Sequence, residues 1–426
     1  MKAPSQPRVE SAQTGLKVVA LDNASRPDLD RFIRVPRSPS IQALYAPYRG
    51  IWCPYTEDTL RQTLSPENPI YEHTDCQLFV ANRDGLDCGR VAAFHNPLSS
   101  LTAEQKLGFF GFFEAADQET ARALLLEGAW PWLKGLGMAG IIGNISPTTN
   151  DEVGVLVEGF HRHIILLEFN PPEYPAFLEG LGFRKAMDVF SFIAPLKAET
   201  FAEVLSGKGS FQDLERIGTL MARRAGVTLE YLNKREVGKV AREFCAMYNR
   251  AWRGHWGFEP FTSAELLYLA RDLLLLLPSD LIILARNKQG KLVGAALCTP
   301  DLNVLFRGFD GRMGLREQLA AAAAIWAPRW LPIKGRPTML RIIAMGVLPE
   351  YERRGAAAAI MARIVQNGMK RGFVEASVSW VLEDNDPMLD IPRRFGLSPD
   401  QTWRLYEYRP GDETEQDGHD GHDGHG

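Results

Sequence analysis

The sequence lacks the features that define several common protein classes. No apolar run approaches the length of about 18 residues that a membrane-spanning helix needs. Five cysteines are scattered along the chain without a C-x-x-C spacing: Cys53, Cys76, Cys88, Cys245 and Cys298. This spacing indicates neither a zinc site nor a disulfide framework, so we expect no structural metal.

The sequence also lacks an excess of basic residues. Its 48 Lys and Arg are outnumbered by 52 Asp and Glu, which gives a net charge of -4. Because nucleic-acid binding depends on clustered basic residues, we expect no nucleic-acid partner. The first residues, which include Lys2, Arg8 and Glu10, hold no apolar core typical of a signal peptide. This predicts a cytoplasmic protein and leaves open a peripheral contact with the inner membrane face.

The length and an internal repeat predict two domains. A chain of 426 residues exceeds what one hydrophobic core usually organises. The order of predicted elements recurs after roughly 205 to 215 residues. Each half has an opening strand, a helical stretch, a hairpin that turns at Asp84-Gly85 or Gln289-Gly290, and a longer apolar strand followed by a helix. This order is typical of an α/β fold with a mixed sheet flanked by helices in each half.

We place the two domains at residues 1–205 and 212–409. Residues 410–426 are rich in Asp, Glu, Gly and His and bury no apolar area, so we expect a disordered tail. Its histidines and carboxylates could loosely hold a divalent ion, but their spacing defines no closed shell.

The most informative segment joins a buried strand to an alanine-rich helix. At the start of a helix the first backbone N–H groups are unpaired and the dipole is positive, so an anion is stabilised there. A glycine and small residues let the backbone approach a pyrophosphate closely. The residues that we expect to form this site are Met345, Gly346, Val347, Glu352, Arg353, Arg354, Gly355, Ala356 and Ala357. The alternative is an ordinary core helix with a charged start.

This segment resembles the acetyl-CoA loop of the GNAT N-acetyltransferase superfamily. That loop has Gln or Arg, two residues, Gly, one residue, and then Gly or Ala; here Glu352 stands where Gln or Arg is usual. Asn385 matches a second position of the family, which adds it to the expected cofactor-binding residues. Pro392 stands where the family often has a Tyr that protonates the leaving CoA thiolate. The resemblance implies acyl-CoA as co-substrate.

In the N-terminal half, residues 114–117 take the place of the glycine-containing turn. They are acidic and would repel a pyrophosphate, so we expect only the C-terminal half to bind CoA. The whole chain is similar to a group of tandem GNAT proteins that includes the bacterial ceramide synthases. The segments that carry this likeness are residues 48–54, 89–93, 108–114, 152–160 and 249–260.

The resemblance implies an N-acyltransferase that acylates a primary amine, with a sphingoid base as the first choice of acceptor. Amide formation needs a group that accepts the proton of the amine and donors for the oxyanion, a part that a backbone N–H near Val347 plays in the superfamily. Our candidates for the base are His255 and Glu259, in a loop rich in glycine and tryptophan, with Glu383 in reserve. For each, a purely structural role is the alternative.

Two apolar stretches, residues 273–277 and 315–330, fit a lipid-like ligand. They could line an acyl tunnel, touch a membrane surface, or pack one lobe against the other. Two other functions stay open at this point. One is an acetyltransferase for a small amine or a peptide, and the other is a non-catalytic acyl-CoA sensor or scaffold, which the missing Tyr would suit.

Overall fold

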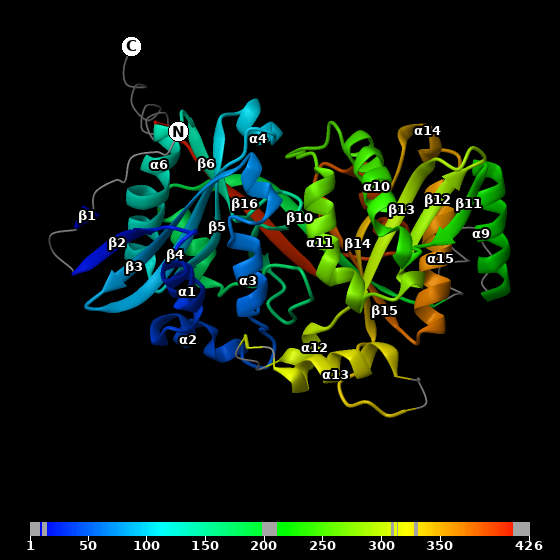
Figure 1. Ribbon diagram of the computed structural model, residues 1–426, viewed down its shortest axis with the longest axis horizontal. Coiled ribbons are helices and arrows are strands. Elements are labelled where there is room, and N and C mark those ends of the chain that lie inside the picture. Colours follow the sequence, from blue (N-terminus) through cyan, green and yellow to red (C-terminus); the bar gives the residue numbers. More distant parts are fainter. Residues whose placement is uncertain are drawn as a thin grey trace, which may run out of the picture.

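The computed structural model describes residues 9–10, 15–197, 211–307, 311–312, 314–327 and 331–411. It has two lobes side by side, one mostly blue to cyan from the N-terminal half and the other mostly green to orange from the C-terminal half, whose last strand is red (Figure 1). We expect the linker between the domains near residues 200 to 212; residues 200–210 of it, and almost all of the expected tail, lie outside the described residues.

The N-terminal half begins with strands and short helices and ends in a long strand. Its strands are β1 (Val9–Glu10), β2 (Leu16–Leu21), β3 (Asp75–Arg83), β4 (Leu86–His95), β5 (Leu107–Ala115), β6 (Gly140–Gly143), β7 (Ile145–Ser146), β8 (Glu152–Val153), β9 (Val155–Glu158) and β10 (Arg184–Pro195). Its helices are α1 (Arg26–Arg34), α2 (Pro39–Tyr45), α3 (Glu57–Leu64), α4 (Ser100–Ala103), α5 (Gln118–Arg122), α6 (Trp130–Gly135) and α7 (Glu173–Glu179), with a π-helical segment (Ala123–Ala129) joining α5 to α6.

The C-terminal half repeats this order. Its strands are β11 (Val227–Tyr231), β12 (Ile282–Asn287), β13 (Leu292–Pro300), β14 (Met339–Val347), β15 (Glu375–Leu382) and β16 (Gln401–Tyr408). Its helices are α9 (Phe211–Ala225), α10 (Val237–Ala251), α11 (Ser263–Leu276), α12 (Asn303–Phe306), α13 (Leu315–Trp326), α14 (Pro349–Glu352), α15 (Ala356–Lys370) and α16 (Asp386–Arg394). The predicted α/β class, the hairpins and the duplicated order of elements are confirmed.

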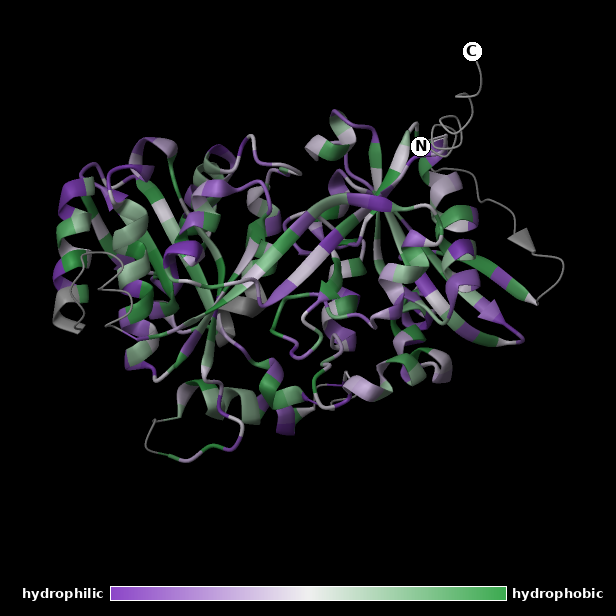
Figure 2. Cartoon of the chain, turned by 180° about the vertical axis from the view of Figure 1, so that it is seen from behind, coloured by the Kyte–Doolittle hydropathy of each residue, from purple (hydrophilic) through white to green (hydrophobic). Residues whose placement is uncertain are grey.

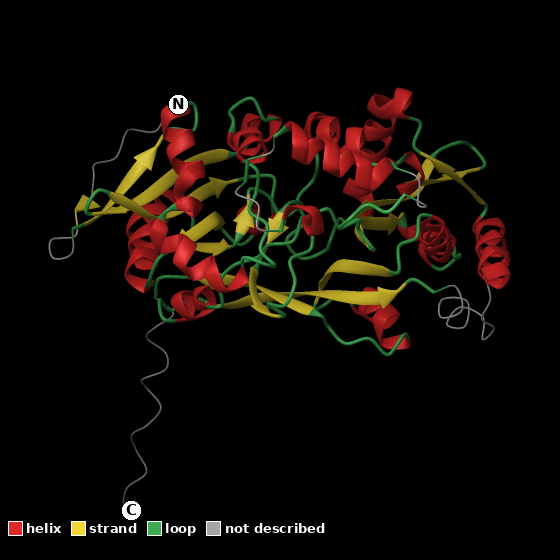
Figure 3. Cartoon of the chain, turned by 90° about the horizontal axis from the view of Figure 1, so that it is seen from below, coloured by secondary structure: helices red, strands yellow, loops and turns green. Residues whose placement is uncertain are grey.

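The strands of the two halves join into one mixed sheet instead of two separate ones. In the described chain the strand order is β1-β2-β3-β4-β5-β6-β16-β10-β15-β14-β13-β12-β11. The last strand of each half has crossed over: β10 pairs with β15, and β16 pairs with β6 and β9. The two crossing strands run through the centre of the molecule, and helices cover both faces of the sheet (Figures 1 and 3). Sequence alone does not reveal the exchange because both halves offer the same sheet edge.

Apolar side chains form a separate core in each lobe. In the C-terminal core α15 packs against β12, β13 and β14, and α9 packs against α15 and β11. Ile283, Val293 and Ile360 are almost fully buried there. Figure 2 shows hydrophobic and hydrophilic residues mixed along the helices. These cores hold β14 and α15 rigidly, and the site described next is built on that pair.

Candidate active site

Strands β14 and β15 separate partway along their length. Their parallel pairing ends at Ile342 and Val378, while β14 continues to Val347. On the other side of β14, Leu297 faces Ala344 and Cys298 faces Ile342, which leaves Ile343 as the extra residue of a β-bulge. A bulge bends its strand and increases the local twist, so β14 turns away from β15 at this point. The backbone edge of β14 beyond Ile342 is therefore not paired with β15, and we call this region, where the two strands diverge toward α15, the wedge.

The turn that follows β14 is shaped to receive an anion. Gly355 has φ of 96°, a conformation that favours glycine, and a Cβ added there would lie 3.0 Å from Met221 Sδ. Among the described residues, no side chain caps α15, so the N–H groups of its first turn are available. The side chains of Glu352, Arg353 and Arg354 are exposed beside it. The backbone conformation, the small residues and the local charge therefore fit a pyrophosphate.

The end of β14 lies against an aromatic pair from α10. A Cβ at Gly346 would collide with the Trp252 ring, so only glycine allows that ring to lie on the strand. The Trp252 ring stacks on Tyr248, with ring centroids 4.5 Å apart. Met345 is half-buried and Val347 is buried. The side chain of Asn385 caps α16, where it accepts a hydrogen bond from Met388 N (3.3 Å).

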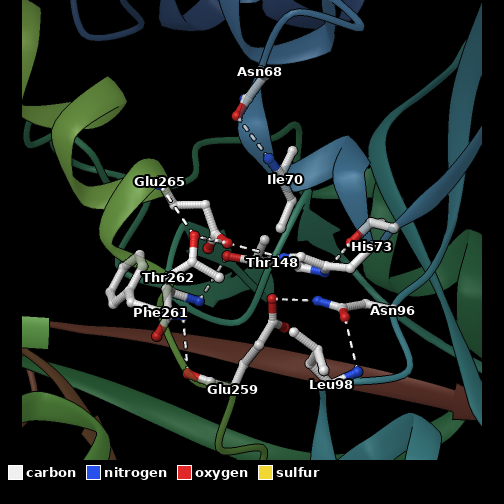
Figure 4. Close-up of polar contacts among 12 residues, drawn as sticks. Asn68, Ile70, His73, Asn96, Leu98, Thr148, Glu259, Phe261, Thr262 and Glu265 are labelled. Carbon is white, nitrogen blue, oxygen red and sulfur yellow. Dashed lines mark hydrogen bonds and ion pairs between the residues drawn. The ribbon is translucent and has the colours of Figure 1, made fainter. Parts of the chain in front are cut away.

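Glu259 is a buried carboxyl group at the junction of the two lobes. Its side chain accepts hydrogen bonds from Asn96 Nδ2 (2.5 Å) and from Thr149 N and Oγ1 (3.4 and 3.5 Å). Asn96 belongs to the N-terminal half, and its approach to Glu259 is drawn in Figure 4. Burial raises the pKa of Glu259 to about 8, because desolvation penalises the carboxylate more than these hydrogen bonds stabilise it.

A chain of contacts connects Glu259 with the wedge. Asn150 donates from Nδ2 to the backbone oxygen of Glu259 (3.1 Å) and accepts from the Tyr248 hydroxyl (2.5 Å). Tyr248 in turn stacks on Trp252, which covers Gly346. The backbone of Glu259 is therefore connected with the end of β14 through Asn150, Tyr248 and Trp252.

A second polar group lies next to Glu259 in Figure 4. His73 Nε2 lies 2.9 Å from Glu265 Oε1, which also accepts from Thr262 Oγ1 at 2.6 Å. Asp151 is half-buried, and desolvation raises its pKa to about 6. Carboxyl groups from both lobes thus gather at one place, and the charges of Asp151 and Glu265 add to the desolvation that raises the pKa of Glu259.

The other two candidates for the base lie in different surroundings. His255 is exposed in the loop that follows α10. Glu383 forms an ion pair with Lys185 Nζ (2.6 Å) and accepts from Asp188 N (3.1 Å), so its carboxylate joins β15 to the crossing strand β10. Of the three, Glu259 alone is buried beside the aromatic residues that cover β14.

The corresponding place in the N-terminal half is occupied by protein side chains. The pairing of β5 with β6 ends at Phe110 and Gly143, but Glu114 lies beyond this point and accepts a hydrogen bond from Tyr174 (2.6 Å). The next helix is capped by Asp117, whose carboxylate accepts from Thr120 N (2.8 Å). A side chain therefore already satisfies the helix start where a phosphate would bind.

Sequence reasoning missed the residues of the N-terminal half that surround Glu259. Asn96 follows β4, and the polar run Thr148, Thr149, Asn150 and Asp151 follows β7. Four consecutive polar residues between β7 and β8 were the available signal. The described residues contain no group of three or more His, Cys, Asp or Glu side chains that could hold a metal ion, which leaves the expectation about metals untested.

Comparisons with known proteins identify the type of fold and chemistry. Residues 241–397 match the acetyltransferase (GNAT) family. The chain is 29% identical over 351 residues to a bacterial ceramide synthase of Caulobacter vibrioides, covering 81% of this chain and 86% of that protein. It is 28% identical over 390 residues to Protein YghO of Escherichia coli, covering 89% and 92%.

A solved structure adds the tandem arrangement. It is a tandem GNAT protein from the clavulanic acid biosynthesis pathway, with a TM-score of 0.51, 12% identity, and coverage of 92% of this chain and 98% of that one. At this identity the likeness concerns the fold alone. Within the part of the chain that the structure describes, no helix is long and apolar enough to cross a membrane.

Proposed function

The chain is an acyltransferase of the GNAT type, and from this premise we propose that it transfers a long-chain acyl group from CoA to a primary amine. The acceptor that we propose is a sphingoid base, and the product a ceramide or dihydroceramide. The observation that carries the donor half of this proposal is the wedge beside β14 that leads to the uncapped start of α15. The choice of acceptor rests on the ceramide synthase relative.

In this proposal the C-terminal lobe binds the donor. Backbone N–H groups of Gly355, Ala356 and Ala357 would hold the pyrophosphate, with Arg353 and Arg354 adding positive charge. The unpaired edge of β14 beyond Ile342 would bind the thioester arm, and a backbone N–H near Val347 would stabilise the developing oxyanion. Asp117 fills the equivalent helix start in the N-terminal half, which supports a single donor site per chain.

Glu259 is the base that we propose. An aliphatic amine has a pKa near 10 and must lose a proton to form an amide, so a base with a pKa close to the working pH is best suited. The value of about 8 for Glu259 meets this condition. Asn96 and Thr149 would hold the carboxylate in place and would link its position to the N-terminal lobe.

The missing Tyr at position 392 does not prevent turnover in this scheme. Pro392 is buried inside α16 and offers no proton. A thiol has an ordinary pKa of about 8.5, so CoA can leave as a thiolate without a dedicated acid.

The proposal is tested by measuring release of the CoA thiol, with a thiol reagent, and amide formation, by mass spectrometry. Acetyl-CoA and palmitoyl-CoA are each combined with a sphingoid base, an amino acid and a polyamine. We expect acceptor-dependent release only with palmitoyl-CoA and the sphingoid base. Release with acetyl-CoA and a small amine would assign the chain to the small-amine acetyltransferases, and tight binding without release would make it an acyl-CoA sensor.

A further inference from the structure

Helix α13 turns an apolar face away from the protein. Leu315, Leu319 and Trp326 are 72%, 60% and 51% exposed, and their spacing along the helix places them on one side. Ala321, on the opposite side, is buried and packs with Leu302 and Phe306 of the α12 region. A helix that is anchored on one side and apolar on the other is expected to have its exposed side covered by something else.

The segment that contains this helix is strongly basic. Residues 307–336 include six Lys or Arg and two Asp or Glu, although the chain as a whole has a net charge of -4. Arg316 and Lys334 are exposed, and Lys234 Nζ lies 5.3 Å from the centre of the Trp326 ring. Leucine and tryptophan bordered by cations are typical of helices that lie on an anionic lipid surface.

The position of α13 in the molecule suits such a contact. Helices α12 and α13 form the lower edge of the protein in Figure 1, whereas α14 lies at the upper edge. Strand β14 runs between these two edges, from Met339 to Val347. A cavity of about 310 Å³ lies behind α13, and Trp326, Lys370, Arg371 and Phe373 are among its lining residues.

We propose that this face, formed by Leu315, Arg316, Leu319 and Trp326, docks the protein onto a bilayer that contains anionic phospholipid. The proposed pyrophosphate site would then point away from the membrane, which separates the negative charge of CoA from that of the lipid. That docking would bring the enzyme to a lipid acceptor rests on the proposed function. The docking itself depends only on the exposed face and its charge.

The positive charge of the face selects this occupant over a second copy of the chain. In a symmetric dimer the same surface meets itself, so Arg316 and the neighbouring Lys234 of both copies would come together. Such like-charge contacts are unfavourable, whereas an anionic bilayer neutralises them.

The test is co-sedimentation of the full chain with large unilamellar vesicles. One set contains phosphatidylcholine with added phosphatidylglycerol, and the other contains phosphatidylcholine alone. We expect binding to the first set, weakened by added salt, and much less to the second. The double variant Leu315→Asp, Leu319→Asp should lower the partition coefficient by about tenfold or more, since it replaces two apolar contacts by charges of the wrong sign.

A matched control comes from two leucines on other surfaces. Leu86 and Leu220 are 64% and 58% exposed, so Leu86→Asp, Leu220→Asp introduces the same charge at similar exposure. This control should bind vesicles like the wild type. Equal loss in both double variants, or no wild-type binding to anionic vesicles, would overturn the proposal, as would a dimer in sedimentation velocity that the Leu315, Leu319 variant abolishes. Because no turnover is measured, an inactive enzyme would leave the vesicle result intact.

Discussion

Glu259 is the side chain on which the proposed chemistry depends. It is buried, it accepts hydrogen bonds from Asn96 and Thr149 of the other lobe, and its pKa is raised to about 8 by desolvation. A carboxyl group that is kept out of water and close to its titration point can accept a proton at neutral to mildly alkaline pH.

Replacing Glu259 should separate chemistry from binding. Glu259→Gln keeps the shape and one acceptor oxygen, replaces the other acceptor by an amide group and removes the base. We expect kcat to fall by about 10² to 10⁴ while the affinity for acyl-CoA is retained. The exposed His255 provides the comparison, and His255→Gln should stay within a few-fold of the wild type. Steady-state kinetics of both variants decides between them, and the reverse result would move the role of base to His255.

The same side chain should determine the pH dependence of activity. Because Glu259 must be deprotonated to act, kcat/KM should rise with pH and show an inflection near pH 8. This inflection should be absent from the residual activity of Glu259→Gln. A profile in which wild type and variant have the same inflection would show that another group is responsible.

Glu259 should also lower the stability of the protein as the pH rises. Its pKa lies near 4.5 in the unfolded chain and near 8 in the fold, so the folded state binds the extra proton in this interval. Its contribution to the free energy of unfolding is therefore fully present below pH 4.5. It falls by on the order of 1.4 kcal/mol per pH unit above that value and is lost by about pH 8. Glu259→Gln should gain in Tm relative to the wild type between pH 5 and about pH 8, as followed by thermal denaturation. A difference in Tm between variant and wild type that does not change with pH would contradict the raised pKa of Glu259.

Among the elements, the start of α15 has the most specific proposed role, which is to bind the pyrophosphate of CoA. Gly355→Ala tests the strain at φ of 96° and the contact with Met221, and Gly355→Glu adds bulk and negative charge at the same position. We expect calorimetry to show a modest loss of CoA affinity for Ala and a loss of at least about tenfold more for Glu. Equal affinities of the two variants would mean that no anion is bound there.

Most elements could be predicted from their hydrophobic periodicity and turn residues. The turns at Asp84-Gly85 and Gln289-Gly290 and the strand that became β14 lie where the pattern placed them. The surroundings of Glu259 could not be predicted in this way, because Asn96 and Thr149 are remote in sequence and approach it only through the packing of the lobes. Periodicity reports which face of an element is buried, not what buries it.

At the scale of the whole molecule, the exchanged strands tie the lobes together. Strand β10 lies between β15 and β16, and Asp188 on β10 binds Arg404 on β16 through two hydrogen bonds of 2.8 and 3.0 Å. The boundaries at residues 1–205 and 212–409 remain a proposal, and under it each half supplies a strand to the sheet of the other.

This continuity predicts joint unfolding of the halves. Because removing either half leaves a sheet edge unpaired, we expect a single transition in differential scanning calorimetry, with calorimetric and van't Hoff enthalpies in agreement. Residues 1–197 expressed alone should be aggregation-prone. Two separate transitions would indicate lobes that fold independently.

The most direct test of the donor site is a crystal structure of the protein with bound CoA. We expect both phosphates of the pyrophosphate within hydrogen-bonding distance of the backbone N–H groups of Gly355, Ala356 and Ala357, with the pantetheine arm along β14 beyond Ile342. A pyrophosphate bound elsewhere, with the turn at Gly355 empty, would contradict the assignment of the donor site to the C-terminal lobe.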